Sequence, residues 1–431
     1  MAFINLSDRS LYLDECVLIA LILGAYAVWL LVAWLRRSRP GLRIGRAVAV
    51  AFLLRLIAAA ALGSISIGSQ LRGGDEDTFL ARAHELVNHS ITSSASLDSL
   101  TSELHTFLFS LNYRIFHPDP PLLMLRVEMI TFSVIGVTLL AAAVYELAGA
   151  RAARVAAWIL ACEPANVFFS SLLHKEPLMY MAEGAVAFGG AVFWTRGKLW
   201  AFVPIVFGCL VATATRPYVG WFLAAAAVAV ILHASLTRQR GARSVLIAGT
   251  MVLLIAAFFP LVLNASSHKS LQSLQESQNA NAQDTSANLS LESVDYSSRG
   301  KLITNLPQRV SDVIFKPYPW QTQNASQRLG VLGTLVMLIA LGFLIVAVAR
   351  DGRLVIQRAA PLIYPALFML VAYSLSAGNA GTAYRYRTHV VGILLCLVVV
   401  LWFGRREEQA APAPSDRLRW QALETEPRLA K

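Results

Sequence analysis

The sequence predicts an all-α protein, a polytopic bundle of about eleven transmembrane helices. Three observations carry this prediction. The 431 residues are 56% hydrophobic and only 15% charged, with a mean hydropathy of +0.56. Apolar runs of about 18 or more residues recur along the chain, as membrane spans require. Basic residues follow every second run, which is the charge pattern of cytoplasmic connections.

The apolar runs define the predicted spans to within a few residues. A soluble protein of this length could not bury so much apolar surface, so each run is assigned to the membrane. The spans are placed at 14–35, 47–68, 122–147, 154–173, 176–195, 199–215, 218–236, 244–264, 329–349, 359–377 and 388–404. They form one bundle over 1–404, and a charged, disordered tail follows over 405–431.

The basic connections set the predicted orientation in the cell membrane. Arginine and lysine concentrate in short cytoplasmic loops, where they determine how a chain inserts. The N-terminus is then outside and the tail is cytoplasmic. The same rule accounts for the net charge of +11, so no nucleic-acid partner is expected. The basic residues of the predicted cytoplasmic connections are Arg36, Arg37, Arg39, Arg43, Arg46, Arg151, Arg154, Arg196, Lys198, Arg238, Arg240, Arg243, Arg350, Arg353, Arg358, Arg405 and Arg406.

Two outer loops are long, 69–121 and 265–327. The first contains two stretches with apolar residues at helical spacing, 79–87 and 97–115, which predict amphipathic helices at the membrane interface. The second begins with a mobile segment rich in Ser, Gln and Asn. It ends in the aromatic and proline cluster 315–320, of a kind that anchors chains among lipid headgroups.

Several outer charges are not explained by the orientation rule. Short outer turns are normally poor in Lys and Arg, and charges at span ends are costly to desolvate, so a functional role is the default hypothesis. Four separate segments carry such groups towards one face. The residues are Asp75, Glu76 and Asp77 after the second predicted span, His174, Lys175 and Glu176 after the fourth, Arg216 after the sixth, and Tyr384, Arg385 and Arg387 after the tenth.

These residues predict a site with two halves. Lys175, Arg216, Arg385 and Arg387 suit a phosphate or pyrophosphate, because a guanidinium makes paired hydrogen bonds to phosphate oxygens. The carboxylates 75–77 suit the removal of a proton from an attacking hydroxyl. A substrate with a lipid tail and a polar head fits such a site at the membrane surface.

Other interpretations stay open for each group. The acids 75–77 also suit a solvated helix N-terminus, and arginines at a span end also suit contact with lipid headgroups. His174 and Glu176 lack a sound metal-ligand spacing, so no metal is assigned to them. Arg55 and Glu163 fall within predicted spans and suit a structural ion pair inside the bundle.

The segment Asp75-Glu76-Asp77-Thr78-Phe79-Leu80-Ala81-Arg82-Ala83 resembles the D-E-x-x-aromatic-x-x-x-A pattern in the first outer loop of the GT-C superfamily of membrane glycosyltransferases. It is most similar to that of protein O-mannosyltransferases and the bacterial aminoarabinose transferase. The turn 170–176 resembles the carrier-phosphate turn of the family. The stretch 381–387 resembles its Gly-x-x-x-Arg-x-Arg segment, and 315–320 the Pro-aromatic-Pro-Trp element of some bacterial relatives. The chain departs from the family in having an extra first helix and no large soluble C-terminal domain.

The resemblance implies an enzyme that moves a sugar from a polyprenyl-phosphate donor to a glycan, lipid or protein acceptor at the extracytoplasmic face. Asp75 would be the general base, and Glu76 and Asp77 would orient hydroxyl groups. Lys-Glu stands where metal-dependent relatives have acidic and His ligands, so no cofactor is expected, although a divalent metal stays open. Two alternatives remain: a polymerase or ligase of pyrophosphate-linked glycans, and a transporter or flippase of a lipid-linked anion. Essential charges at the interface favour a transferase, whereas charges at the midplane favour a carrier.

Overall fold

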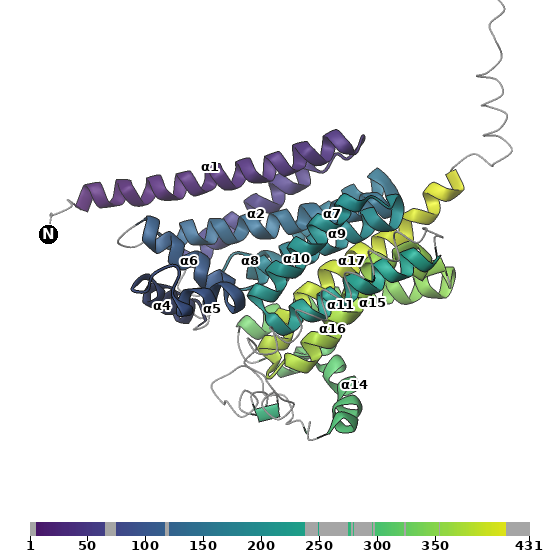
Figure 1. The fold of residues 1–431 in the computed structure, drawn as a ribbon. Helices are drawn as coiled ribbons and strands as arrows, with labels where there is room; N and C mark the ends of the chain where they lie inside the picture. Colours follow the sequence, from purple (N-terminus) through teal and green to yellow (C-terminus); the bar gives the residue numbers. More distant parts are fainter. Residues whose placement is uncertain are drawn as a thin grey trace, which may run out of the picture.

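The structure, a computed structural model, describes residues 6–64, 75–116, 120–237, 298–322, 325–352 and 354–410, with a few single positions between 249 and 295. These ranges are built of helices, so the all-α prediction is confirmed for the described part of the chain. The helices that form the bundle run side by side (Figure 1). They are α1 (Leu6–Ser38), α2 (Gly45–Ser64), α7 (Leu122–Cys162), α9 (Glu176–Arg196), α10 (Phe202–Thr215), α11 (Pro217–Thr237), α15 (Ala325–Asp351), α16 (Leu354–Ser376) and α17 (Ala380–Ala410).

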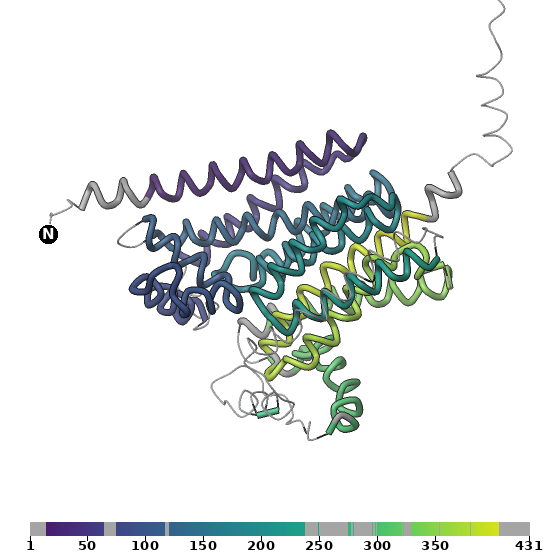
Figure 2. Tube along the Cα trace, in the orientation of Figure 1, coloured from purple at the N-terminus to yellow at the C-terminus, as the bar shows by residue number. Residues whose placement is uncertain are grey.

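Other helices pack around the bundle. They are α4 (Asp75–Val87), α5 (Ser94–Ser102), α6 (Leu104–Ile115), α8 (Pro164–Ser170) and α14 (Arg299–Phe315), with 3₁₀ turns η1 (Leu199–Ala201) and η2 (Pro319–Gln321). Helices α4, α5 and α6 gather at the end of the bundle where α7 begins (Figure 1 and Figure 2). We call this end of the bundle, where α9, α11 and α17 also begin, the outer end, after the side of the membrane that the basic connections predict for it.

Seven of the described helices are long and apolar enough to cross a membrane: α1, α2, α7, α11, α15, α16 and α17. The chain is therefore described as a membrane protein. The predicted number of about eleven spans is therefore not confirmed by the described helices. Helix α9 carries Glu176, Glu183 and Arg196, and α10 is a shorter apolar helix of 14 residues. The predicted span 244–264 lies outside the described residues.

The predicted fourth span, 154–173, is shared between the end of α7 and the short helix α8. Helix α7 consists of two helical segments that meet at a break at Gly149, whose φ of 80° lies in the left-handed region that glycine tolerates best. Arg55 donates both to Ser133 Oγ before the break and to the Ala161 carbonyl after it, so the second segment runs back beside the first. Glu163 then ends this helix and starts α8, because its carboxylate accepts hydrogen bonds from the N–H groups of Ala165 and Asn166. The second segment of α7 and α8 thus together occupy the predicted fourth span, which bends at Glu163.

In place of the expected ion pair between Arg55 and Glu163, each side chain has other hydrogen-bond partners. The Arg55 guanidinium donates to Ser133 Oγ (3.2 Å), to the Ala51 carbonyl (2.9 Å) and to the side chain of Asn166. Glu163 serves as the helix cap described above. Both side chains are buried and hold the bend between α7 and α8 in place, so both are structural.

Small residues let the central helices approach closely. Helix α7 packs against α1, α2, α9 and α17. A Cβ added at Gly136 of α7 would lie 2.6 Å from the Tyr180 carbonyl oxygen of α9, and one at Gly184 would lie 2.7 Å from the Gly136 carbonyl oxygen. Such contacts are typical of helices in membranes, where packing rather than the hydrophobic effect drives association.

The amphipathic stretches of the first long loop form α4, α5 and α6. The predicted second stretch is split at Glu103, where α5 ends and α6 begins. The apolar faces of α4 and α6 pack on the bundle, since Ala83 and Phe109 form one core cluster with Leu125, Met129 and Leu173. The loop is therefore folded against the outer end of α7.

Basic residues of different predicted cytoplasmic connections meet at the opposite end. Arg39 and Arg196 both contact Glu146, at 2.6 and 2.7 Å, although they lie far apart in the sequence. Arg350 and Arg358, which belong to one connection, share Asp351. Helix α17 runs to Ala410, so the beginning of the predicted disordered tail is helical. Residues 411–431 lie outside the described residues.

Candidate functional site

Three acidic residues form the first turn of α4, where carboxylates interact favourably with the helix dipole. They point in different directions. The side chain of Asp75 is 50% exposed, and Asp77 is exposed. Glu76 is buried: its carboxylate pairs with Arg126 of α7 at 2.8 Å and accepts the N–H of Leu173 at 2.7 Å. Glu76 therefore anchors α4 to the bundle. The sequence predicted that it would orient a substrate hydroxyl, but its carboxylate is buried and already paired.

Charged side chains from separate helices meet next to Asp75. Arg385 of α17 donates a hydrogen bond to the Asp75 carboxylate, and its Nε lies 3.2 Å from Glu176 Oε1 at the start of α9. The same Glu176 oxygen accepts a hydrogen bond of 2.5 Å from Arg216, which lies between α10 and α11. We call these four residues, Asp75, Arg385, Glu176 and Arg216, the outer charge cluster. The structure thus brings together groups that are up to 310 positions apart in the sequence.

Aromatic rings hold Arg216 in this cluster. Its guanidinium lies over the Tyr386 ring, 4.5 Å from the centroid, with Tyr373 at 5.9 Å. Tyr218 donates a hydrogen bond of 3.3 Å to the Tyr386 hydroxyl. A cation over an aromatic face is stabilised electrostatically, so these rings fix the position of Arg216 without neutralising it.

Several buried polar atoms of this region have no hydrogen-bond partner among the described residues. They include Glu176 Oε2, Arg216 Nη1 and His174 Nδ1. Leaving a buried donor or acceptor unpaired costs roughly 1–3 kcal/mol, so each such atom calls for an explanation. A polar ligand at the cluster would supply the missing partners.

Lys175 lies on the turn between α8 and α9, at the edge of the cluster. Its Nζ is 3.9 Å from Glu103 Oε1 and lies over the Phe79 ring, 5.6 Å from the centroid. Burial, together with the nearby positive charge of Arg216, lowers the pKa of Lys175 to about 8. This ammonium is therefore held mostly charged at neutral pH and loses its proton in mildly alkaline conditions.

The neighbouring Asp75 and His174 are also shifted. Burial alone would raise the pKa of Asp75, but the Arg385 guanidinium outweighs it and holds that pKa below its usual range. Burial and the positive charge of Arg385 lower the pKa of His174. At neutral pH the site therefore contains an ionised carboxylate and a neutral imidazole.

Two predicted phosphate ligands lie outside the cluster. The guanidinium of Arg387 is buried and donates to the main-chain carbonyls of Ile314, Lys316 and Gly330 at 2.8–3.0 Å. Tyr384 packs edge-on against Phe169, with ring centroids 5.1 Å apart, and lies beneath Arg387. Both residues hold α17 against its neighbours, so the predicted phosphate clamp is reduced to Lys175, Arg216 and Arg385.

Sequence reasoning missed a polar pair deeper in the bundle. Glu183 of α9 lies 3.1 Å from His389 of α17, and both side chains are buried. The His389 ring stacks on Tyr373, with centroids 5.3 Å apart. Glu183 is an acid inside an apolar run, which is itself a signal of function or of a buried partner. It could have been noticed on that ground.

Comparison with models of known protein families, with curated proteins and with solved structures found no match for this chain. Within the described residues, no group of three or more His, Cys, Asp or Glu side chains is arranged as a metal site would require. The site is therefore interpreted from its own geometry.

Proposed function

We propose that this protein is a membrane glycosyltransferase of GT-C type, which transfers a sugar from a polyprenyl-phosphate donor to an acceptor hydroxyl. The observation that carries the proposal is the outer charge cluster. Cations held by rings and carboxylates lie next to a half-exposed carboxylate, at one end of a bundle of apolar helices. A donor with a lipid tail in the membrane and a phosphate at its surface fits this arrangement. The resemblance of 75–83 to the family motif supports the same conclusion.

The proposed reaction is a displacement at the anomeric carbon. The acceptor oxygen forms a bond to this carbon while the bond from the carbon to the phosphate oxygen breaks. The proton of the acceptor hydroxyl passes to the Asp75 carboxylate, which acts as general base. The electron pair of the broken bond remains on the lipid phosphate, and Arg385, Arg216 and Lys175 stabilise its charge.

The ion pair between Asp75 and Arg385 gives this mechanism an order of events. The Arg385 guanidinium, paired with Asp75, holds the pKa of that carboxyl below its usual range. A donor phosphate that binds Arg385 competes with Asp75 for the guanidinium. The carboxylate then loses part of its charge neutralisation, its pKa rises, and it becomes a stronger base when the donor is in place.

The deep pair of Glu183 and His389 favours a second candidate, a proton-coupled transporter or flippase of a lipid-linked anion. Titratable groups inside a bundle are common in proton pathways. A transferase needs the outer charge cluster, whereas a carrier needs the deep pair. The cluster is favoured because it combines unpaired buried polar atoms with a partly exposed acid, which suits a ligand that reacts there. A polymerase or ligase of pyrophosphate-linked glycans would use the same cations but has no special need for Asp75.

The proposal places the protein in the cell membrane with the charge cluster outside, the N-terminus outside and the C-terminus in the cytoplasm. The basis is the alternation of basic connections. We expect a reporter fused after Arg243 to be cytoplasmic and one inserted near Gln278 to be external, with paired enzymatic reporters active on opposite sides. The reverse result would put the cluster inside and remove access to an extracytoplasmic acceptor.

The function is tested by mass spectrometry of polyprenyl lipids in cells that lack the protein. We expect a polyprenyl-phosphate sugar to accumulate in these cells, and re-expression of the wild-type protein to remove it. Asp75→Asn and Arg385→Ala should fail to do so, because each loses roughly a hundredfold or more in transfer rate. Asp77→Asn, which changes an exposed acid two positions away, is the matched control and should restore turnover. Glu183→Gln should also restore it.

Two outcomes would contradict the proposal. The first is that no lipid-linked sugar accumulates in the deletion strain. The second is that Asp75→Asn complements as well as wild type while Glu183→Gln does not, which would favour the transporter. Detergent-purified variants with unchanged elution and thermal unfolding show that a loss of turnover is not a loss of folding.

A further inference from the structure

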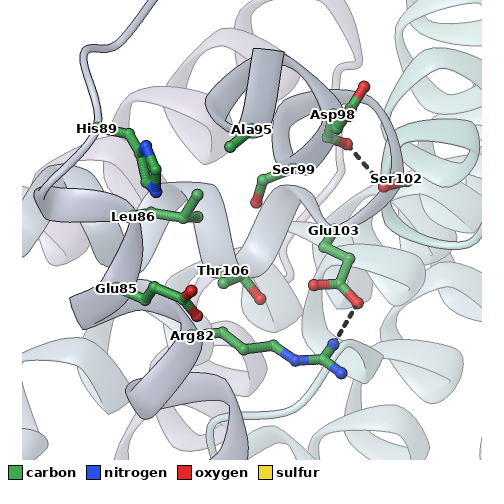
Figure 3. Close-up of a pocket in the computed structure, with 10 residues that line it drawn as sticks. All are labelled: Arg82, Glu85, Leu86, His89, Ala95, Asp98, Ser99, Ser102, Glu103 and Thr106. Carbon is green, nitrogen blue, oxygen red and sulfur yellow. Dashed lines mark hydrogen bonds and ion pairs between the residues drawn. The ribbon is translucent and has the colours of Figure 1, made fainter. Parts of the chain in front are cut away.

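A pocket of about 310 Å³ lies among α4, α5 and α6 (Figure 3). This volume is within the range of small-molecule sites. The pocket is distinct from the outer charge cluster, because none of the residues of that cluster lines it. Its lining residues are Arg82, Glu85, Leu86, His89, Ala95, Asp98, Ser99, Ser102, Glu103 and Thr106.

Glu103 connects the pocket to the charge cluster. It stands between α5 and α6, yet its side chain makes no helix-capping hydrogen bond. Its Oε1 instead accepts a hydrogen bond of 2.7 Å from Arg82 inside the pocket and lies 3.9 Å from Lys175 Nζ. One carboxylate thus borders both sites, so a molecule in the pocket lies next to the proposed donor phosphate.

Ser99 marks the interior of the pocket. Its side chain is directed into the space between the helices (Figure 3), its residue is only 8% exposed, and its Oγ has no hydrogen-bond partner among the described residues. The neighbouring Ser102 differs, because its hydroxyl already donates to the Asp98 carbonyl at 2.6 Å. A buried hydroxyl without a partner is uncommon, and a hydroxyl or amide group of a ligand would satisfy it.

The lining also indicates the chemical class of the ligand. Glu85, Asp98 and Glu103 outnumber the single guanidinium of Arg82, so an anionic ligand would be repelled. Carboxylates, hydroxyls and an imidazole can hydrogen-bond many hydroxyl groups, while Leu86 and Ala95 offer apolar contact to C–H groups. This mixture suits a neutral, hydroxyl-rich molecule.

We infer that this pocket binds the acceptor, and that the acceptor is a neutral oligosaccharide. The inference rests on the proposed function and deepens it. Arg82 lies seven positions after Asp75 on α4, which corresponds to roughly 10 Å at 1.5 Å per residue. A sugar unit in the pocket is therefore not the unit whose hydroxyl reacts at Asp75, so the acceptor contains more than one sugar.

The inference is tested by saturation-transfer NMR of the purified full-length protein with three trisaccharides. The probes are mannotriose and N,N′,N″-triacetylchitotriose, which are neutral, and trigalacturonate, which is anionic. We expect at least one neutral probe to bind and the anionic probe not to bind. Ala95→Trp fills the pocket and should abolish this signal, whereas Ser94→Trp, at an exposed position on the same helix, should keep it.

Ser99→Ala provides a gentler variant in case the tryptophan prevents folding. Loss of one ligand hydrogen bond should weaken binding by about threefold to tenfold. Binding of neither neutral probe, binding of trigalacturonate alone, or binding unchanged in both Ala95→Trp and Ser99→Ala would overturn the inference.

Arg385→Ala separates this inference from the proposed function. The variant should bind the neutral trisaccharide as wild type does, because its guanidinium does not line the pocket. If the pocket binds but no lipid-linked sugar accumulates in deletion cells, the transferase proposal fails and the binding site stands. If lipid-linked sugar accumulates and the pocket does not bind, the inference alone fails.

Discussion

Arg385 and Arg387 lie two residues apart on α17, yet they belong to different regions of the molecule. Arg385 lies in the outer charge cluster between the carboxylates of Asp75 and Glu176, and it retains partial exposure. Arg387 is buried on the other side and donates to three main-chain carbonyls near α14 and α15. One guanidinium is available to a ligand and the other completes the protein fold.

Helix geometry explains the difference. Successive residues of an α-helix turn by about 100°, so residues two positions apart point to nearly opposite sides. An Arg-x-Arg sequence can converge on one phosphate only if the backbone is extended or turning. Here α17 begins at Ala380, so the pair is already inside a helix and is separated.

The largest effect that tests this comparison is on stability. We expect Arg387→Ala to lower the free energy of unfolding by about 3–5 kcal/mol, because three buried carbonyls lose their donor. Folded protein in the membrane should fall severalfold. Arg385→Ala is the matched control: it should fold nearly normally while losing transfer. Thermal unfolding of both purified variants provides the measurement, and equal stability would remove the distinction between the two arginines.

Much of this architecture could be predicted from the sequence. The apolar runs located the described long helices, and the unexplained outer charges identified segments that meet in space at Asp75, Glu176, Arg216 and Arg385. Residue type and hydropathy suffice for this, because charged groups at span ends must find partners.

Side-chain direction could not be predicted in the same way. Glu76 sits beside Asp75 in the motif but faces Arg126, which depends on how α4 docks on α7. The cap at Glu163 divides the predicted fourth span into two helical pieces, because an acid in an apolar run does not by itself reveal a bend. The pocket arises from the packing of α4, α5 and α6, which no local pattern determines.

The smallest expected effect concerns Lys175, which lies in the proposed phosphate site with Arg385 and Arg216. Of these three cations, Lys175 is the one that can lose its proton near neutral pH. Burial and the charge of Arg216 lower its pKa to about 8, so it is charged below this pH and neutral above it. Affinity for polyprenyl phosphate should therefore fall as the pH rises from 7 to 9.5, by roughly tenfold, which corresponds to about 1.4 kcal/mol. Arginine stays charged throughout this range.

Lys175→Arg should consequently bind polyprenyl phosphate with little dependence on pH above 7. Lys198→Arg, at the opposite end of α9, is the matched control and should retain the decrease seen in wild type. The measurement is the dissociation constant of polyprenyl phosphate in lipid nanodiscs at several pH values. If the affinity of Lys175→Arg still decreases with pH as in wild type, the titration belongs to another group. The proposed phosphate site would then be reduced, among the described residues, to Arg385 and Arg216.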